Sequence, residues 1–228
     1  MLRSPWIRRP DFSKVRNLDY DAYWEERGWE IAASLKPREE IMLEMVPSGA
    51  RVFDVGCGNS LLPVRLREKG AHVTVGDISS KVLDGYRKLG IEAIELDLED
   101  VSMIRFDRRY DYIVLSEVLE HLRNPEEVMA MLAPHTERFL ITVPNSAAYI
   151  FRYGLLVRGR FFTQWVYHPS EHLRYWSHTD MLDWLGAVGL DVEEVRVADG
   201  FTLGGLLLFL PRLWKNLFGY RMVYRCRV

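Results

Sequence analysis

The stretch Arg51–Ser60 constrains this chain more than any other, because it joins a short strand to a turn that contains two glycines. Residues 52–55 are mostly apolar and β-preferring, and Gly56 and Gly58 interrupt them directly before an amphipathic segment. Glycines at these positions let a ligand approach the backbone, and a helix that follows them presents unpaired N–H groups. The stretch predicts strand, tight turn and helix, with a polar cofactor bound against bare backbone.

A second strand-like run, 73–75, ends at Gly76 and Asp77. An acidic side chain at the tip of the second strand can accept hydrogen bonds from both hydroxyls of a ribose. Asp77 lies 23 residues after Asp54, close to the roughly 20 residues that one strand, one helix and the next strand require. Both signals indicate a cofactor that contains a nucleoside.

The details of the turn decide between cofactors. A dinucleotide fingerprint requires a third glycine three residues after Gly58, and this chain has Leu61 there. A nicotinamide oxidoreductase is therefore disfavoured. Asp54 instead supplies an acidic group that can counter an ammonium or sulfonium carried by the ligand.

These motifs resemble those of a known family. Asp-Val-Gly-Cys-Gly at 54–58 resembles the first motif of class I S-adenosylmethionine-dependent methyltransferases, and Val-Gly-Asp-Ile-Ser at 75–79 resembles their second. The likeness is to methyltransferases of type 11/12 and of ubiquinone synthesis, and it runs from about 51 to 197. It implies S-adenosylmethionine as cofactor, S-adenosylhomocysteine as product, and a cofactor site made of Asp54, Gly56, Cys57, Gly58, Asn59, Asp77, Ile78, Asp97, Leu98, Ser116 and Glu117.

Within that site, the resemblance implies that the glycines seat the amino-acid end of the cofactor and that Asp77 holds the ribose. Asp97 would accept from the adenine amino group, with Leu98 over the ring. The alternative for Asp97 is a surface acid in the acidic loop 95–100.

Strands and helices alternate through most of the chain, which predicts an open parallel α/β sheet with helices on both faces. The resemblance implies a Rossmann-like seven-stranded sheet whose last strand is antiparallel. We expect a single domain, 1–228, with an N-terminal arm and helical cap at 1–48, a cofactor-binding core at 49–144, an acceptor-side insertion at 145–176 and the rest of the sheet at 177–228. Strands are expected at 91–96, 110–116, 139–143, 190–197 and 220–228, and helices at 19–35, 37–46, 61–69, 79–89, 125–132 and 179–188.

Glu117, Glu120 and His121 follow the fourth predicted strand at helical spacing, so they project from one face of a helical turn. The Glu-x-x-Glu-His pattern resembles that of ubiquinone-pathway and small-RNA methyltransferases, which use it to hold magnesium. Three interpretations stay open: a Mg²⁺ site, a general-base or cofactor-side role for His121, and a structural helix cap. His168 and His172 are candidate further ligands.

Two aromatic and basic stretches suggest partners. The insertion has no acidic residue between 145 and 170, fits no regular element of the alternation, and is expected to cover the pocket of a small-molecule acceptor. Residues 201–218 combine leucines with arginine, lysine and tryptophan, a composition that suits contact with a membrane surface, a buried helix or a dimer contact. The aromatic cap helices are expected to pack as core.

Composition limits the remaining choices. The formal net charge of −2 argues against a nucleic-acid partner, and two cysteines outside any metal or redox spacing favour a reducing compartment, so a cytoplasmic protein is expected. The favoured function is methyl transfer to a small-molecule or quinone-like acceptor, most simply on oxygen. The alternative is a non-catalytic partner protein like MetW of methionine biosynthesis, which residues 144–145, 159–160 and 216–219 resemble. The sequence leaves the acceptor and the oligomeric state open.

Overall fold

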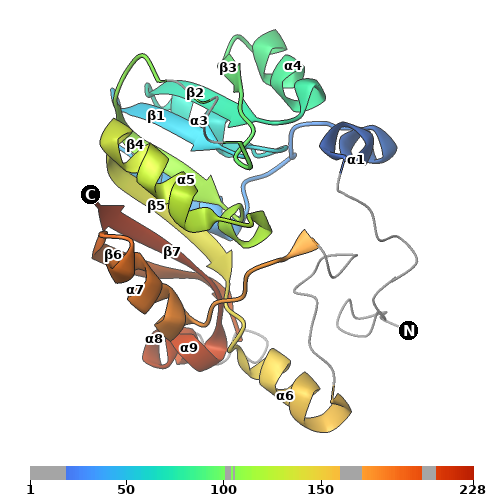
Figure 1. The fold of residues 1–228 in the computed structure, drawn as a ribbon, viewed down its shortest axis with the longest axis vertical. Helices are drawn as coiled ribbons and strands as arrows, with labels where there is room; N and C mark the ends of the chain where they lie inside the picture. Colours follow the sequence, from blue (N-terminus) through green and yellow to red (C-terminus); the bar gives the residue numbers. More distant parts are fainter. Residues whose placement is uncertain (1–18, 101–103, 105, 160–170, 202–208) are drawn as a thin grey trace.

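The computed structural model describes residues 19–100, 104, 106–159, 171–201 and 209–228. In these ranges one sheet runs through the molecule with the strand order β3-β2-β1-β4-β5-β7-β6 (Figure 1). The strands are β1 (Arg51–Val55), β2 (His72–Asp77), β3 (Glu92–Glu95), β4 (Tyr110–Ser116), β5 (Thr136–Pro144), β6 (Asp191–Gly200) and β7 (Gly219–Arg227). Strand β7 is antiparallel to both of its neighbours, whereas β1 to β5 pair in parallel, which confirms the expected sheet.

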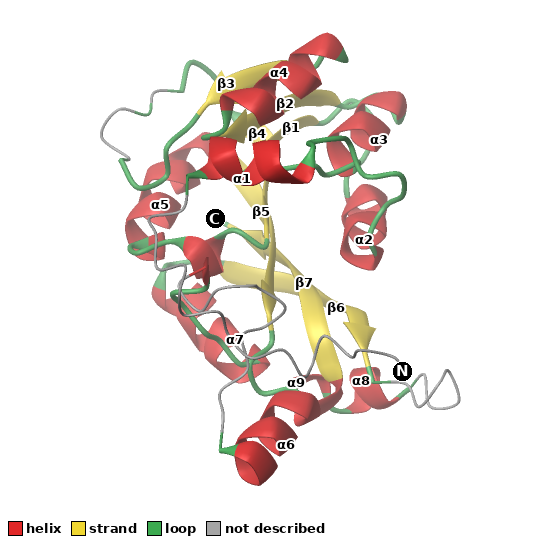
Figure 2. Cartoon of the chain, turned by 90° about the vertical axis from the view of Figure 1, so that its right-hand side faces the viewer, coloured by secondary structure: helices red, strands yellow, loops and turns green. Residues whose placement is uncertain are grey.

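Helices cover both faces of this sheet, as the alternation predicted. They are α1 (Tyr20–Arg27), α2 (Pro37–Met45), α3 (Leu62–Glu68), α4 (Ser80–Lys88), η4 (Leu119–His121), α5 (Pro125–Leu132), η5 (Ala133–His135), α6 (Tyr149–Arg158), α7 (His178–Ala187), α8 (Leu210–Leu213) and α9 (Lys215–Phe218). Figure 2 shows the sheet from its side, with α3 and α4 toward one end of the molecule and α6, α8 and α9 toward the other.

The core has two layers, one on each face of the sheet, because successive side chains of a strand point to opposite faces. Phe53, Ile113 and Phe139 face α5 and α7. Val52 and Val114 face α2 and α3 in a second cluster. The central strands β1 and β4 are thus buried on both sides, which is why they read as almost continuous apolar runs.

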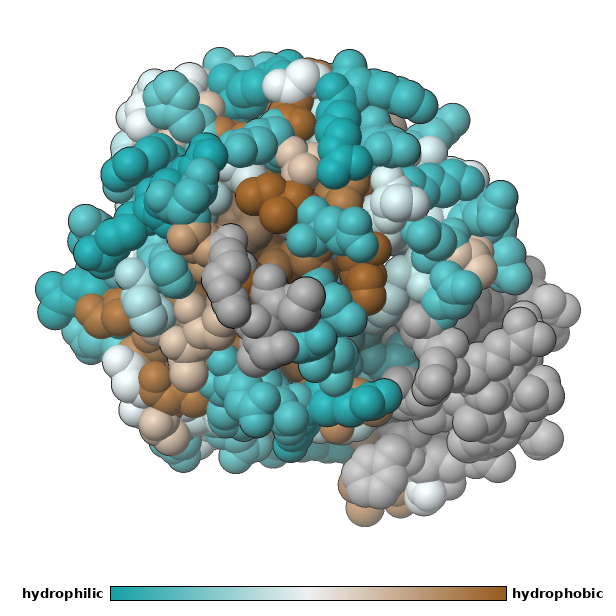
Figure 3. Space-filling model, turned by 45° about the horizontal axis from the view of Figure 1, so that its top comes forward, coloured by the Kyte–Doolittle hydropathy of each residue, from teal (hydrophilic) through white to brown (hydrophobic). Residues whose placement is uncertain are grey.

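The surface shows the complementary pattern. The face in Figure 3 is largely hydrophilic, and apolar side chains gather near its centre. Within the described ranges, no helix has the length and hydropathy needed to cross a membrane.

The strand order reverses direction beside β1. From β1 the chain moves outward to β2 and β3, then returns to place β4 on the other side of β1. In open α/β sheets a crevice forms outside the carboxyl ends of the strands at such a switch point. The turns after β1, β2 and β4 therefore meet at one place.

Two local expectations were wrong. The helix predicted over 19–35 ends at Arg27, because Gly28 adopts a left-handed conformation with φ 62° and its N–H bonds back to the last turn. The insertion was expected to lack regular structure, but residues 149–158 form helix α6, which ends at the left-handed Gly159. The predicted irregular arm 1–16 lies outside the described residues.

Asn145 joins the end of β5 to the C-terminal elements. Its buried amide group donates to the Gly219 carbonyl oxygen over 2.7 Å, and its side-chain oxygen accepts from the backbone N–H groups of Ala147 and His178 over 3.0 and 3.2 Å. One side chain thereby satisfies backbone groups of three segments. Removal of such a side chain leaves buried partners unsatisfied.

We predict that Asn145→Ala lowers the free energy of unfolding by about 2–4 kcal/mol, because several buried backbone groups lose their partner at once. Urea unfolding followed by circular dichroism measures this change. Asn124→Ala is the matched control: Asn124 is exposed and its side chain makes no capping hydrogen bond, so a loss under about 0.5 kcal/mol is expected. Equal losses in the two variants would contradict the assignment.

Candidate functional site

The turn after β1 requires its two glycines. Gly56 and Gly58 have φ of 69° and 52°, which side chains rarely adopt. A Cβ atom on Gly56 would lie 2.7 Å from a methyl carbon of Val118, and one on Gly58 would lie 3.2 Å from the ring of Trp24. The turn therefore keeps its backbone open to a ligand and packs closely against its neighbours.

The carboxylate of Asp77 ties this turn to the end of β2. One oxygen accepts from the backbone N–H of Gly58 over 2.9 Å, and the other accepts from the N–H of Ser79 over 3.0 Å. Burial raises the pKa of Asp77, and these backbone hydrogen bonds oppose that effect. The side chain is 8% exposed, and it lines the cavity described next.

A cavity of about 790 Å³ opens at the carboxyl ends of β1, β2 and β4. This volume suits a nucleoside-sized ligand. All the residues predicted to bind the cofactor line it, together with the candidate general base: Asp54, Gly56, Cys57, Gly58, Asn59, Asp77, Ile78, Asp97, Leu98, Ser116, Glu117 and His121. Their individual roles remain predictions. The Asp97 carboxylate also accepts from the backbone N–H of Glu99 over 2.9 Å, which fixes its loop.

The helical cap forms part of the cavity wall, which sequence reasoning missed. Tyr20, Tyr23 and Trp24 of α1 line the cavity, although their spacing was interpreted as that of core residues. Asp21 holds α1 in place by accepting hydrogen bonds from the Ser79 and Ser80 hydroxyls over 2.6 and 3.2 Å. Because this contact joins residues almost 60 positions apart, no local sequence pattern predicts it.

Negative charge accumulates on one side of the cavity. Burial raises the pKa of Asp54 well above its ordinary value, and the charges of Glu39 and Asp77 raise it further. A positively charged ligand would relieve this repulsion. Two cations line the same wall and partly offset this charge: Lys36, whose pKa is lowered by burial and by Arg38, pairs with Glu39, and Arg38 donates to the Ser116 hydroxyl over 3.0 Å. No sequence motif marks either residue as part of the site.

The carboxylate of Glu117 is engaged in an ion pair with Arg221. Its backbone has φ 60°, unusual for a residue with a side chain, and its carboxylate accepts from Thr142 over 3.1 Å and from Arg221 over 3.0 Å. Burial alone would raise the pKa of Glu117, but Arg38, Arg221 and these hydrogen bonds outweigh burial and lower it. Arg221 also donates to Asp199 over 2.6 Å. Glu117 is therefore ionised and fixed in place.

Glu120 lies in the opposite environment. It is fully buried, and neither of its carboxylate oxygens has a hydrogen-bond partner in the described part of the chain. Burial, and then repulsion from Glu117, raise its pKa well above the ordinary value. Glu120 does not line the cavity, although it is next to His121, which does.

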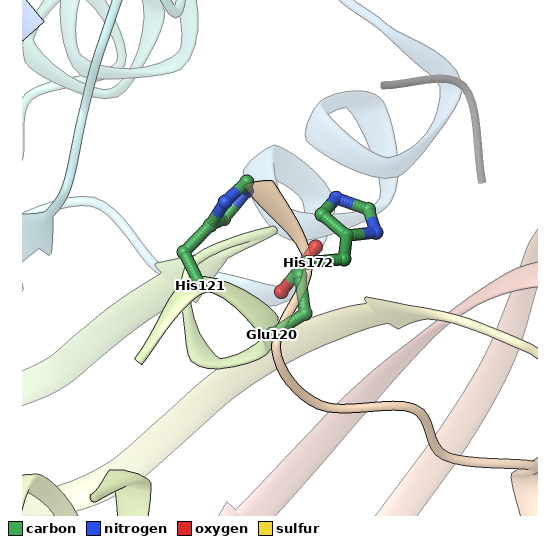
Figure 4. Close-up of side chains that lie close together, drawn as sticks. All are labelled: Glu120, His121 and His172. Carbon is green, nitrogen blue, oxygen red and sulfur yellow. The ribbon is translucent and has the colours of Figure 1, made fainter. Parts of the chain in front are cut away.

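The structure brings Glu120 together with His121 and His172 (Figure 4). One ligand atom from each lies within 4.8 Å of the others. Burial lowers the pKa of His121, and burial and His121 lower the pKa of His172 to about 3, so both rings are uncharged at neutral pH. Ligands about 2.1 Å from an ion lie at most about 4.2 Å apart, so the cluster fits a divalent cation after a small contraction. The structure thus adds His172 to the predicted candidates, and His168 lies outside the described residues.

Known proteins match this chain in sequence over most of its length. Residues 23–195 match the model of a methyltransferase domain family. The chain is 29% identical to the ubiquinone biosynthesis O-methyltransferase of Coxiella burnetii over 83% of this chain and 88% of that protein. It is 26% identical to the bifunctional methionine biosynthesis protein MetXA/MetW of Rhodopirellula baltica over 71% of this chain, but over only 28% of that longer protein.

Solved structures agree with the fold. A crystal structure of an S-adenosylmethionine-dependent methyltransferase from Mesorhizobium loti matches with a TM-score of 0.57, at 20% identity, over 84% of this chain and 98% of that one. The likeness supports the sheet and its order of strands.

We predict that the binding of S-adenosylmethionine releases protons, because a cationic ligand favours the ionised form of Asp54, whose pKa is raised in the free protein. Its affinity should therefore rise with pH through the raised pKa of Asp54. Calorimetric titration below pH 7.5 in buffers of different ionisation enthalpy measures the proton count.

S-adenosylhomocysteine, which lacks the sulfonium charge, is the matched ligand and should release fewer protons. Asp54→Asn should reduce the release seen with either ligand. Equal heats in all buffers for the wild type would contradict the role assigned to Asp54.

Proposed function

The chain belongs to the methyltransferase domain family and is an S-adenosylmethionine-dependent methyltransferase, and we propose that it methylates an oxygen atom of a small, quinone-like acceptor. The proposal depends mainly on the two hydrogen bonds that the Asp77 carboxylate accepts. They connect the glycine turn after β1 to the turn after β2, and both turns line one cavity. The sequence likeness to ubiquinone biosynthesis O-methyltransferases supports the acceptor class and the choice of oxygen.

The cavity offers a partner for each part of the cofactor. Asp77 can accept from the ribose hydroxyls while it keeps its two backbone donors, since a carboxylate has about four acceptor sites. The turn of Gly56 and Gly58 would seat the amino-acid end, where Asp54 faces the ammonium group. Arg38, fixed by Ser116, would pair with the carboxylate at that end. Asp97 and Leu98 would contact the adenine.

When bound, the cofactor supplies a methyl group activated by its sulfonium. The acceptor oxygen would receive this methyl group and lose its proton, and the cofactor would leave as a neutral thioether. His121 would take the acceptor proton, because its lowered pKa keeps the ring uncharged and its side chain lines the cavity. The remaining catalysis is positioning of the two reactants.

We predict that the wild-type protein binds S-adenosylmethionine and that Asp77→Ala weakens binding at least about 100-fold, because ribose and backbone donors lose a charged acceptor together. Asp77→Asn keeps one acceptor oxygen, so its affinity for S-adenosylmethionine should fall by about 10-fold. Calorimetry gives both values.

Asp84→Ala removes an exposed carboxylate of the neighbouring helix and should bind as the wild type does. Full affinity in Asp77→Ala would overturn the site. Methyl transfer from labelled cofactor to catechol-type acceptors tests the reaction itself, and label on a ring carbon with none on oxygen would overturn the choice of oxygen.

The alternative is a MetW-like protein that assists acyl transfer. Its support is the 26% identity to the MetXA/MetW protein, which covers less of this chain and little of that relative. Co-purification of an acyltransferase, together with absent methyl transfer to every acceptor, would favour this alternative.

As the alternative to the general-base role of His121, we also infer that Glu120, His121 and His172 hold a divalent cation. A buried carboxylate with both oxygens unpartnered in the described structure is costly unless it is protonated or bound to an ion. Two imidazoles and one carboxylate suit a transition metal such as Mn²⁺ or Zn²⁺ better than Mg²⁺, which prefers oxygen ligands. The three side chains would hold the ion beside the cavity wall at His121.

We predict that the wild type binds one Mn²⁺ or Zn²⁺ per chain, more tightly than Mg²⁺, and that Glu120→Gln weakens this binding at least about 10-fold. Titration calorimetry and elemental analysis of the dialysed protein provide the measurement. The matched control is Glu117→Gln, since Glu117 is bound to Arg221 and should be dispensable for the metal. If Glu117→Gln loses metal binding and Glu120→Gln retains it, Glu117 rather than Glu120 is the ligand.

A further inference from the structure

Exposed apolar side chains gather at one end of the molecule. Helices α6, α8 and α9 lie together there in both ribbon views (Figures 1 and 2). Of the twelve large exposed apolar side chains in the described ranges, seven belong to this end, and we call them the apolar face: Tyr153, Leu155, Leu156, Val157, Phe209, Leu213 and Trp214. Leu156 is 85% exposed and Leu213 is 76% exposed, so neither contributes to the core.

The apolar face is anchored on the fold. The ring of Tyr149, in the first turn of α6, lies 4.7 Å from the ring of Phe201 and 6.5 Å from that of Phe218. Helix α6 therefore starts from packed aromatic residues beside α9, and its last turns carry the exposed leucines. An apolar surface built on packed helices is a preformed binding surface rather than a loose tail.

The charge of this region is one-sided. Arg152, Arg212 and Lys215 lie among the apolar residues, and the segments 145–159 and 209–221 contain no aspartate or glutamate. The nearby acids belong to adjoining elements: Asp180 of α7 accepts from the backbone N–H of Ser177, Asp183 of α7 is exposed, and Asp199 of β6 pairs with Arg221. An anionic partner would therefore meet net positive charge on the apolar face itself.

We propose that the apolar face binds the surface of an anionic lipid bilayer. Leucines would enter the boundary between headgroups and acyl chains, the tryptophan and tyrosine would sit at headgroup depth, and the basic side chains would pair with lipid phosphates. The longest of these helices has 10 residues, and a membrane-spanning helix needs about 20. The contact is thus peripheral.

A second copy of the chain fits this face less well. A two-fold contact places the same patch on both sides, so the basic side chains Arg152, Arg212 and Lys215 of one copy would face a patch of the other copy that is also basic and has no acid of its own. The negative surface potential of an anionic bilayer instead attracts each of them. Helix α6 leaves the carboxyl end of β5, so the bilayer would lie toward the sheet edge that holds the cavity.

Flotation of the full-length protein with vesicles of phosphatidylglycerol and phosphatidylcholine, at low salt, tests this inference, which does not depend on cofactor binding. The wild type should float with the anionic vesicles, much less with pure phosphatidylcholine, and less as salt rises. Leu156→Asp with Leu213→Asp should weaken binding at least about 100-fold, near tenfold for each leucine. Arg212→Gln with Lys215→Gln should weaken it about 25-fold, near fivefold for each charge.

Leu89→Asp is the matched control, because Leu89 is a half-exposed leucine at the end of α4, outside the apolar face. It should float as the wild type does, and all variants should keep their melting temperature and their affinity for S-adenosylmethionine. Absence of the wild type from the anionic vesicle fraction would overturn the inference, as would unchanged flotation of the double leucine variant. If the wild type sediments as a dimer and does not bind lipid, and the double leucine variant sediments as a monomer, the apolar face is instead a contact with a second copy of the chain.

Discussion

The hydrogen bonds of the Asp77 carboxylate are the constraint on which the cofactor site depends. Parallel pairing sets β1 beside β2, but pairing alone does not fix the loops that follow the two strands. By accepting from the N–H of Gly58 and the N–H of Ser79, one side chain sets the distance between both loops and the start of α4. The helix cap, the open glycine turn and the seat of α1 on Ser79 all follow from that arrangement. In the proposed site, ligand recognition would use the same two oxygens that hold the loops together.

Two carboxylates three residues apart show how tertiary structure decides charge. Glu117 and Glu120 look alike in the sequence, yet the pKa of the first is lowered and that of the second is raised. The difference comes from Arg38 and from Arg221, which is more than 100 residues away in sequence and donates to Glu117, whereas the buried carboxylate of Glu120 has no hydrogen-bond partner in the described structure. The buried pair with Arg221 therefore keeps charge at the cavity wall and confines the neutral, orphaned carboxyl to the histidine cluster behind it.

The sheet and the binding turns could be predicted because their signals are local. Apolar runs and the helix-start residue Ser79 specify their elements directly, as does the placement of Gly56 and Gly58. The cap residues Tyr20 and Trp24, the cations Lys36 and Arg38, and His172 could not be placed, since each reaches the site through contacts distant in sequence. Helix α6 was missed because Gly154 and several β-branched and aromatic residues make its sequence a weak helix former, and tertiary packing of Tyr149 compensates.

The position of β7 has a consequence for the order in which the chain can be assembled. Strand β6 pairs only with β7, which itself lies between β6 and β5. A chain emerging from the ribosome completes β1 to β5 as a parallel unit, but β6 then remains without its partner until β7 is released. During that interval the edge of β5 and the whole of β6 are open to pairing with other chains. Arg221 lies on β7, so the ion-pair partner of Glu117 is available only after β1 to β6 have been synthesised, and until then Arg38 alone opposes the charge of Glu117.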